Sequence, residues 1–416
     1  MDSKEFFIPR LGEAQIASPV QAMEFVPDDA TVAYDTSTAV LEEYVKNGQA
    51  IPAFEQAGPR KLIYHDPAWS KAAILTAGGL CPGLNDVIKF LTLTLKNIYH
   101  VPLVYGIRYG YRGLNPAHGL APIQLNEDNT DDIHQQGGTI LGSSRGEESA
   151  EIMVETLARM NINLVFCIGG DGTARGAHDI AVEAERRGLS ISVISIPKTI
   201  DNDIAFIDKS FGFETAVYMA GIFAAGAHNE AKGAYNGIGL VKVMGRDSGF
   251  IAAYATLAQS YVNYCLVPES KFVLDGDGPD ALLPHLYKRM LEKQHAVIMV
   301  AEGAGQELFP QGEDVRDASG NLINKDIGLL LKDRINQYFN LAYTIRSVAA
   351  HGADAVFCAM LAQNAVHAAM AGRTDMVVGH WNGHFTHVPI ALATRERKKI
   401  QLNSPLWTSV KASTCF

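Results

Sequence analysis

Three segments of the sequence place glycines and charged side chains directly after apolar runs. The clearest is CIGGDGTARG at residues 167–176, where three glycines surround Asp171. Glycine lets the backbone approach a ligand closely. A carboxylate among backbone donors repels a bare phosphate but can hold Mg²⁺, which binds carboxylate, phosphate and water oxygens together. The segment therefore indicates a metal–phosphate site, and a tight turn closed by Asp171 is the alternative. Thr173 is predicted as the N-cap of the following helix.

The second segment, LTAGGLCPGLNDVI at residues 75–88, offers Gly78, Gly79 and Gly83 before a predicted helix. Free N–H groups at a helix N-terminus attract anions, so this loop is a candidate phosphate site. The lysine of a P-loop is missing. An ordinary strand–helix turn is the alternative.

The third segment is PKTIDNDI at residues 197–204, again after an apolar run. Asp201 and Asp203 would share a face in an extended segment and diverge in a tight loop. Of two such carboxylates, one can act as general base while the other holds metal or tunes its partner. Lys198 can offset negative charge on a transferred phosphoryl group. A solvated loop with capping aspartates is the alternative.

The elements that must position these segments follow from alternating apolar runs and amphipathic stretches. Strands are predicted at 72–76, 102–106, 164–168, 191–196, 237–243, 262–267, 296–301 and 375–378. Helices are predicted at 85–97, 149–159, 174–187, 215–231, 249–259, 279–292, 327–337 and 355–371. This pattern predicts α/β layers with mostly parallel sheets, whose ligand sites lie beyond the carboxyl ends of the strands.

Composition narrows the class of protein. A chain of 416 residues is long enough for two domains, and its net charge of −10 gives no support to a nucleic-acid or membrane-surface partner. The five cysteines show no zinc-binding spacing, which favours a reducing compartment. We find no signal-peptide pattern and no run of 18 apolar residues. A cytoplasmic protein is expected.

Over about residues 70–395 the sequence resembles the phosphofructokinase family. The resemblance rests on nine segments in the family's order: TAGGLCPGLN, LGSSRG, IGGDGTARGA, PKTIDNDI, FGFETA, VKVMGRDSGFIA, PES, AEGAGQ and YTIR. Lys198, DKSFGFETAV and the N-terminal extension make it similar to the ATP-using branch of plants and trypanosomatids. The resemblance implies two α/β sandwich domains with the active site in the interdomain cleft.

The resemblance implies transfer of the γ-phosphoryl group of ATP to the 1-hydroxyl of fructose 6-phosphate, with Mg²⁺. Asp201 would accept the hydroxyl proton, and Asp203, Lys198 and Arg246 would complete the catalytic set. Thr199 and Ile200 would flank the acceptor hydroxyl. The nucleotide phosphates would contact Gly79, Arg145, Gly146, Gly170, Asp171, Gly172 and Thr173, with Asp171 on the metal. The sugar phosphate would contact Met244, Gly245, Arg246, Glu302, Tyr343, Thr344, Ile345 and Arg346.

The domains implied are an N-terminal extension at 1–66, a nucleotide domain at 67–212 plus 347–394, a sugar-phosphate domain at 213–346 and a tail at 395–416. A homotetramer is expected, with a dimer as the alternative. Short bacterial relatives supply an arginine from a neighbouring subunit just before the VKVMGR strand. Here that stretch reads GAYNGIG, so other cations, among them Lys232 and Lys242, are candidates.

Three rival functions remain. Pyrophosphate-dependent relatives typically carry a second aspartate where this chain has Gly172, although they share Lys198. NAD and diacylglycerol kinases contain a GGDGT segment but lack the other motifs. A non-catalytic regulatory subunit would have lost the carboxylates, and both Asp171 and Asp201 are present. His351, His380, His384 and His387 do not match zinc signatures and are expected to be solvated or structural.

Overall fold

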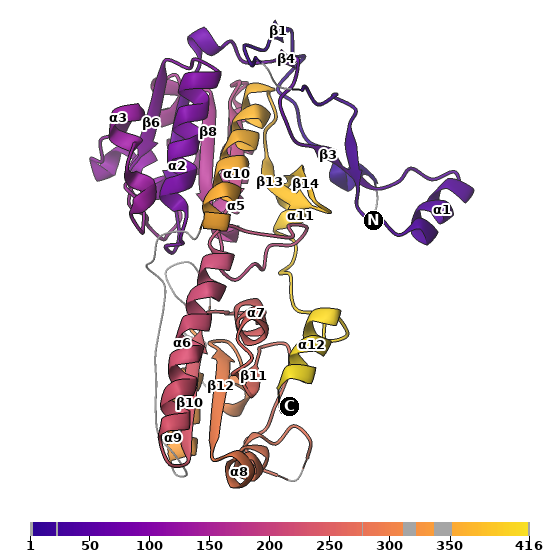
Figure 1. The fold of residues 1–416 in the computed structure, drawn as a ribbon. Coiled ribbons are helices and arrows are strands. Elements are labelled where there is room, and N and C mark those ends of the chain that lie inside the picture. The colour runs from indigo at the N-terminus through magenta and orange to yellow at the C-terminus, as the bar shows by residue number, and fades with distance from the viewer. Residues whose placement is uncertain (1–2, 22–23, 277, 311–321, 337–351, 415–416) are drawn as a thin grey trace. The chain divides into compact units, whose positions relative to one another are not determined.

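The computed structural model describes residues 3–21, 24–276, 278–310, 322–336 and 352–414. The chain forms two compact units (Figure 1). Unit 1 comprises Met1–Thr199, Ile204–Phe211 and Ser347–Glu396, and unit 2 comprises Ile200–Asp203, Gly212–Arg346 and Arg397–Phe416. Among the described residues, no helix combines the length and apolarity that a membrane span requires.

Unit 1 is built on a nine-stranded sheet with the order β2-β3-β14-β13-β9-β8-β5-β6-β7. Its strands from β13 to β6 run parallel, and the remaining pairs are antiparallel. The strands are β2 (Thr31–Ala33), β3 (Ala53–Gln56), β5 (Lys71–Thr76), β6 (Leu103–Ile107), β7 (Ile123–Leu125), β8 (Leu164–Gly169), β9 (Ser192–Pro197), β13 (Met376–Trp381) and β14 (His384–Pro389). A separate pair joins β1 (Ile16–Ala17) to β4 (Leu62–Ile63).

Helices cover both faces of this sheet because its central strands are apolar on both sides. On one face, Leu75, Cys167 and Val193 join a core with α4 (Ala150–Arg159) and α5 (Asp171–Arg186). Since side chains alternate along a strand, their neighbours face the pair α2 (Leu84–Leu93) and α10 (Gly352–Met370), which pack together in Figure 1. Short helices are α1 (Thr38–Lys46), α3 (Glu127–Thr130) and α11 (Ile390–Ala393).

Unit 2 has a parallel three-stranded sheet with the order β10-β12-β11. The strands are β10 (Gly237–Val243), β11 (Tyr264–Leu266) and β12 (His295–Ala301). Four helices pack against this sheet: α6 (Phe213–Gly233), α7 (Phe250–Ala258), α8 (Leu282–Lys293) and α9 (Ile327–Asn336). A fifth helix, α12 (Pro405–Ser413), packs against α7. Remaining turns are 3₁₀-helical at Ser3–Phe6, Pro67–Trp69, Gly110–Leu114, Pro116–His118, Ile133–Gln135 and Gln306–Leu308, and π-helical at Thr94–Ile98.

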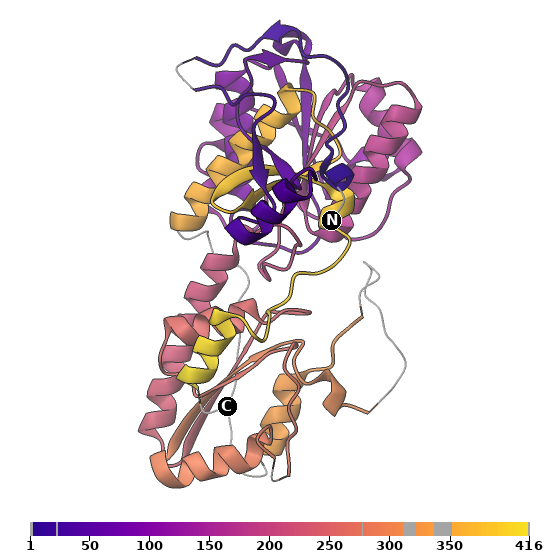
Figure 2. The ribbon, with the colours of Figure 1, turned by 90° about the vertical axis from the view of Figure 1, so that its right-hand side faces the viewer.

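The predicted α/β class is confirmed, and each predicted strand and helix overlaps an observed one. The structure adds two details to these predictions. Within the N-terminal extension at 1–66, β2 and β3 continue the large sheet beyond β14 (Figure 2). The strand predicted at 375–378 is longer and returns as β14 in an antiparallel hairpin.

Aromatic and ionic contacts hold the N-terminal residues to unit 1. Tyr34 stacks on Trp381 with ring centroids 5.9 Å apart, and Phe206 packs against both rings. The guanidinium groups of Arg60 and Arg373, both buried, contact Glu55 Oε1 at 3.1 and 2.7 Å. This paired carboxylate, whose side chain is only 12% exposed, ties β3 to the chain that leads into β13.

Two buried histidines of unit 1 make its stability depend on pH. Burial lowers the pKa of His65 and of His367 to about 4. The unfolded chain therefore binds protons that the folded chain does not, and the free energy of unfolding falls as pH drops below about 6.5. Each histidine contributes at most about 1.4 kcal/mol per pH unit between about pH 6.5 and its folded pKa.

We expect the thermal unfolding midpoint to fall between pH 7 and pH 5, and the fall to be smaller in His367→Gln. His367 bonds the Tyr99 hydroxyl at 2.6 Å, so the substitution itself costs stability, and the pH slope is the quantity to compare. The exposed His384→Asn is the control and should keep the wild-type slope. An unchanged slope in His367→Gln would contradict the assignment.

Candidate functional site

The carboxyl ends of three neighbouring parallel strands of unit 1 lie side by side in the large sheet. β5, β8 and β9 are adjacent, with Thr76 opposite Ile168 and Gly169 opposite Pro197. The ladder continues into the loops, because Lys198 N donates to Gly169 O at 2.9 Å. The GGDG loop, the first glycine loop and the start of the PKTIDND segment are thereby brought together, as the parallel order predicts.

The GGDG segment forms the N-terminus of α5. Gly170 is the N-cap and Asp171 the first helical residue, so the prediction of Thr173 as N-cap is wrong by three residues. Thr173 instead packs back on the strand end: a Cβ at Gly169 would lie 2.0 Å from its Oγ1. The helix consequently begins directly at the strand end, and its first N–H groups and positive dipole end lie at the carboxyl ends of the same strands.

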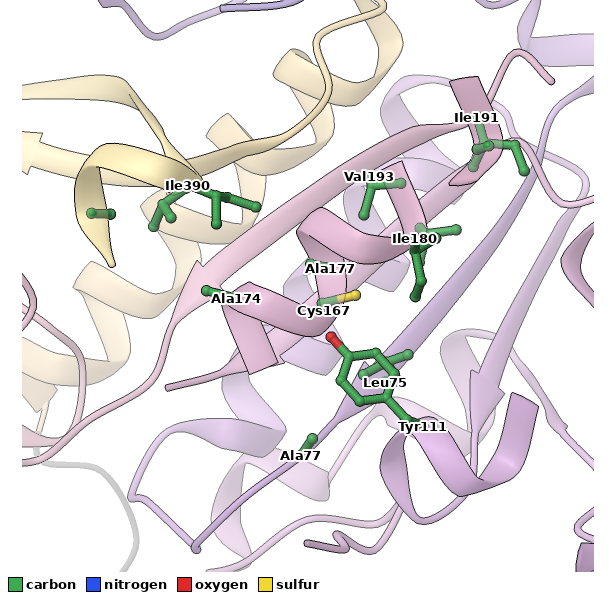
Figure 3. Close-up of a cluster of buried hydrophobic side chains, with 14 of the residues drawn as sticks. Leu75, Ala77, Tyr111, Cys167, Ala174, Ala177, Ile180, Ile191, Val193 and Ile390 are labelled. Atoms are coloured by element: carbon green, nitrogen blue, oxygen red, sulfur yellow. The ribbon is translucent and has the colours of Figure 1, made fainter. Parts of the chain in front are cut away.

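Tyr111 fixes the first turn of α5, and nothing in its sequence context indicated this role. Its hydroxyl donates to Thr173 O at 2.5 Å, and Figure 3 shows this hydroxyl pointing toward Cys167 on the side where α5 lies. A Cβ at Gly176 would lie 2.6 Å from the ring, so only glycine admits this contact. Burial raises the pKa of Tyr111 well above its ordinary value, which keeps the phenol a donor.

A cavity of about 580 Å³ opens beside the first glycine loop. Gly78 N donates to Ser144 O at 3.1 Å, and Ser143 Oγ donates to Gly78 O at 2.5 Å. The side chain of Lys198 approaches the same loop, since a Cβ at Gly78 would lie 3.2 Å from its Nζ. The residues lining the cavity are Gly78, Gly79, Leu80, Gly137, Gly138, Thr139, Gly142, Ser143, Ser144 and Arg145.

This cavity unites two of the predicted nucleotide residues, Gly79 and Arg145, and Gly146 follows them with a φ of +113°. Sequence reasoning missed Gly137, Gly138 and Thr139. Their only signal was a second pair of glycines before LGSSRG. A loop rich in glycine beside a guanidinium and an ammonium group suits a ligand that carries several negative charges.

In unit 2, the turn at residues 200–203 lies against the loop that follows β10. Asp201 Oδ2 accepts a hydrogen bond from Arg246 N at 3.4 Å, and Ser248 Oγ donates to Asp201 O at 3.1 Å. Asp203 Oδ2 instead contacts Arg397 Nη1 at 2.6 Å. The two carboxylates thus contact different groups, as expected of a tight turn rather than an extended segment.

The ends of β10 and β12 place two predicted sugar-binding segments side by side. Glu302 N donates to Val243 O and Gly303 N to Gly245 O, both at 2.9 Å. A Cβ at Gly303 would lie 1.7 Å from Arg246 O, so glycine is required for this approach. The carboxyl ends of β10 and β12 are therefore followed by Met244, Gly245 and Arg246 on one strand and by Glu302 on the other.

Several predicted residues have other placements. Lys242 Nζ pairs with Asp326 Oδ1 at 2.7 Å. Tyr343, Thr344, Ile345 and Arg346, like His351, lie outside the described residues. Of the remaining histidines, His387 is buried beside Glu55 at 3.3 Å and His384 is exposed. Within the described part of the chain, no three His, Cys, Asp or Glu side chains gather as a metal cluster.

Fold and site together define an α/β protein with a glycine-rich anion cavity and carboxylates at parallel strand ends. The family model for phosphofructokinase matches residues 71–369. An ATP-dependent 6-phosphofructokinase of Borreliella burgdorferi is 52% identical over 378 residues, covering 86% of this chain and 84% of that protein. One of Trypanosoma brucei brucei is 42% identical over 375 residues, covering 86% and 76%.

Among solved structures, a pyrophosphate-dependent phosphofructokinase of Nitrosospira multiformis matches with a TM-score of 0.67 and 19% identity, covering 81% of this chain and 87% of that one. At that identity the likeness concerns the fold alone. The chain belongs to the phosphofructokinase family, which confirms the resemblance drawn from the nine sequence segments.

We expect Gly83→Ala to destabilise the first glycine loop. Gly83 is the N-cap of α2 with a φ of +99°, and a Cβ would lie 2.7 Å from Cys358 Sγ and 3.0 Å from the Phe211 ring. Backbone strain and overpacking together should lower the free energy of unfolding by about 2–4 kcal/mol in urea denaturation. Gly188→Ala, at a φ of +68° with open space, should cost only the strain, about 1 kcal/mol. Equal losses would show that the close approach is unimportant.

Proposed function

We propose that this chain is an ATP-dependent 6-phosphofructokinase, which transfers the γ-phosphoryl group of ATP to the 1-hydroxyl of fructose 6-phosphate. The observation that carries the proposal is the meeting of the glycine cavity, Lys198 and the N-terminus of α5 at adjacent strand ends. Relatives named for this activity match over most of the chain and favour ATP over pyrophosphate.

The nucleotide phosphates are assigned to the edge of the large sheet in unit 1. Gly79, Arg145 and Gly146 supply the glycine loop and a cation, and Gly170, Asp171, Gly172 and Thr173 supply the helix N-terminus. The donors fit Mg²⁺, because the Asp171 carboxylate stands at the start of α5 beside glycines that leave space. Asp171 would hold the ion, which would neutralise charge on the transferred phosphoryl group.

The acceptor side is assigned to the turn at 200–203. Asp201 accepts the proton of the 1-hydroxyl while the hydroxyl oxygen forms a bond to the γ-phosphorus. The bond between the γ-phosphorus and the bridging β-phosphate oxygen breaks, which releases ADP. Thr199 and Ile200 flank the hydroxyl. Thr199 is held by Ser210, whose Oγ donates to Thr199 O at 2.6 Å. Lys198 and Arg246 offset the negative charge spread over the phosphoryl oxygens, and Asp203 supports metal or base.

The sugar phosphate is assigned to Met244, Gly245, Arg246 and Glu302 at the edge of the small sheet. Glu302 accepts hydrogen bonds from sugar hydroxyls, and Arg246 contributes a guanidinium suited to phosphate. Tyr343, Thr344, Ile345 and Arg346 for the 6-phosphate end remain predictions from the sequence. The interdomain cleft, the homotetramer with its dimer alternative, and the cytoplasmic location also stay predictions.

We assign ATP as the phosphoryl donor from the residue that follows Asp171. Gly172 is exposed, and the nearest atom to a Cβ placed there would be Arg175 Nη2 at 4.0 Å, so space remains for a nucleotide. We expect purified protein to phosphorylate fructose 6-phosphate with Mg²⁺ and ATP but not with pyrophosphate. A coupled assay with each donor in turn tests this. Turnover with pyrophosphate alone would refute the donor assignment and leave Lys198 as the deciding residue.

A second expectation concerns the base. Asp201→Asn should lower kcat by about 10²–10⁴-fold, because a positioned base contributes about this much, and should leave the affinity for ATP unchanged. Steady-state kinetics and equilibrium ATP binding measure the two effects. Asp128→Asn, an exposed carboxylate in α3, is the matched control. A wild-type kcat in Asp201→Asn would exclude Asp201 as the base.

A further inference from the structure

The segment that follows Glu396 runs along the turn that carries Asp201 and Asp203. Arg397 Nη1 contacts Asp203 Oδ2 at 2.6 Å, and Lys398 N donates to Asp203 O at 2.7 Å. Asp203 is therefore held through both its side chain and its backbone by two consecutive residues. These residues lie almost 200 positions later in the sequence, and no family motif that we identified includes them.

The ion pair is one whose strength depends on burial. The Asp203 side chain is only 1% exposed, whereas that of Arg397 is 34% exposed. A short, charge-assisted bond satisfies a carboxylate that has lost its water, and removing the partner of such a group is costly. Arg397 Nε also lies 3.9 Å from Asp247 Oδ2, so the guanidinium links the turn to the loop that begins at Met244.

The tail segment is itself held in place by the start of α7. Ile400 N and Gly249 N both donate to Glu269 Oε1, at 2.9 and 3.0 Å. The Lys398 ammonium lies 5.2 Å from the centre of the Phe250 ring. Arg397 is thus presented to Asp203 from a segment with several contacts of its own, rather than from a loose end.

The turn between the carboxylates needs such support. Asn202 is buried and has a φ of +54°, a left-handed conformation that asparagine adopts more readily than other non-glycine residues and that its surroundings must hold. Asp201 precedes this residue and Asp203 follows it. The direction of the Asp201 carboxylate therefore depends on the backbone conformation that the contacts to Asp203 maintain.

We propose that Arg397 is a positioning residue for the phosphoryl transfer: by holding Asp203 it keeps the Asp201 carboxylate aimed at the acceptor hydroxyl. The inference rests on the proposed function, which assigns the base to Asp201. Arg397 acts through Asp203 and touches no reacting atom. Its loss should therefore reduce kcat and leave the KM values for both substrates nearly unchanged, because misaligned reactants still bind.

The test compares Arg397→Met, Arg397→Lys and Arg395→Met by steady-state kinetics. Arg397→Met should lower kcat by about tenfold or more, equivalent to about 1.4 kcal/mol, with KM within twofold of wild type. Arg397→Lys keeps the charge without the planar fork and should recover part of kcat. Arg395, two residues earlier, pairs with Glu5 at 2.9 Å, both residues being at least one-third exposed, and its variant should behave as wild type.

A second measurement guards against simple misfolding. In Asp203→Asn the buried charge is gone, so adding Arg397→Met no longer removes a cation from a carboxylate. If Arg397 acts through Asp203, the double variant should have the kcat of Asp203→Asn within twofold. An Arg397→Met enzyme with wild-type kcat, or an equal loss in the Asp203→Asn background, would overturn the inference. A wild-type chain inactive with both phosphoryl donors would instead refute the proposed function itself.

Discussion

The backbone ladder that joins β5, β8 and β9 in parallel is the constraint on which the nucleotide side of the proposed site depends. Its last bonds reach past the strands, so that the residue after β9 is tied to the last residue of β8. Three loops that are separated by some 120 residues of chain are thereby fixed at one edge. Without that register, the glycine cavity and the start of α5 would not lie close enough to contact one ligand together.

The two sides of the proposed site use different chemistry. On the nucleotide side, absent side chains matter most: glycines expose N–H groups, and Tyr111 keeps the helix terminus in place from below. On the acceptor side, charged side chains dominate, with Asp201, Asp203 and Arg246 held in a turn and a loop. Backbone donors suit an anion that must bind and leave, whereas a base needs one direction and a controlled environment.

Local pattern was sufficient to predict the strands and the loops that follow them. Apolar runs ending in glycine located the strands, and short motifs identified Asp171, Lys198 and Asp201 as candidates, because their signals lie within about ten residues. Features that depend on distant contacts were missed. The start of α5 is set by the packing of Thr173 on Gly169. Tyr111 contacts α5, and Arg397 contacts Asp203, only in the folded chain, because these residues are far apart in the sequence. β2 and β3 are too short and too weakly patterned for the sequence to predict that they join the sheet.

The strand order also has a consequence for biosynthesis. In the large sheet, β13 and β14 lie between β3 and β9, although they are translated last among its strands. Until about residue 389 has left the ribosome, the β2–β3 hairpin has no sheet to join and one edge of β9 stays open. A nascent chain with an unpaired apolar edge is prone to associate with others. Chaperone contact during synthesis should therefore concentrate on β9, and end when the β13–β14 hairpin closes the sheet.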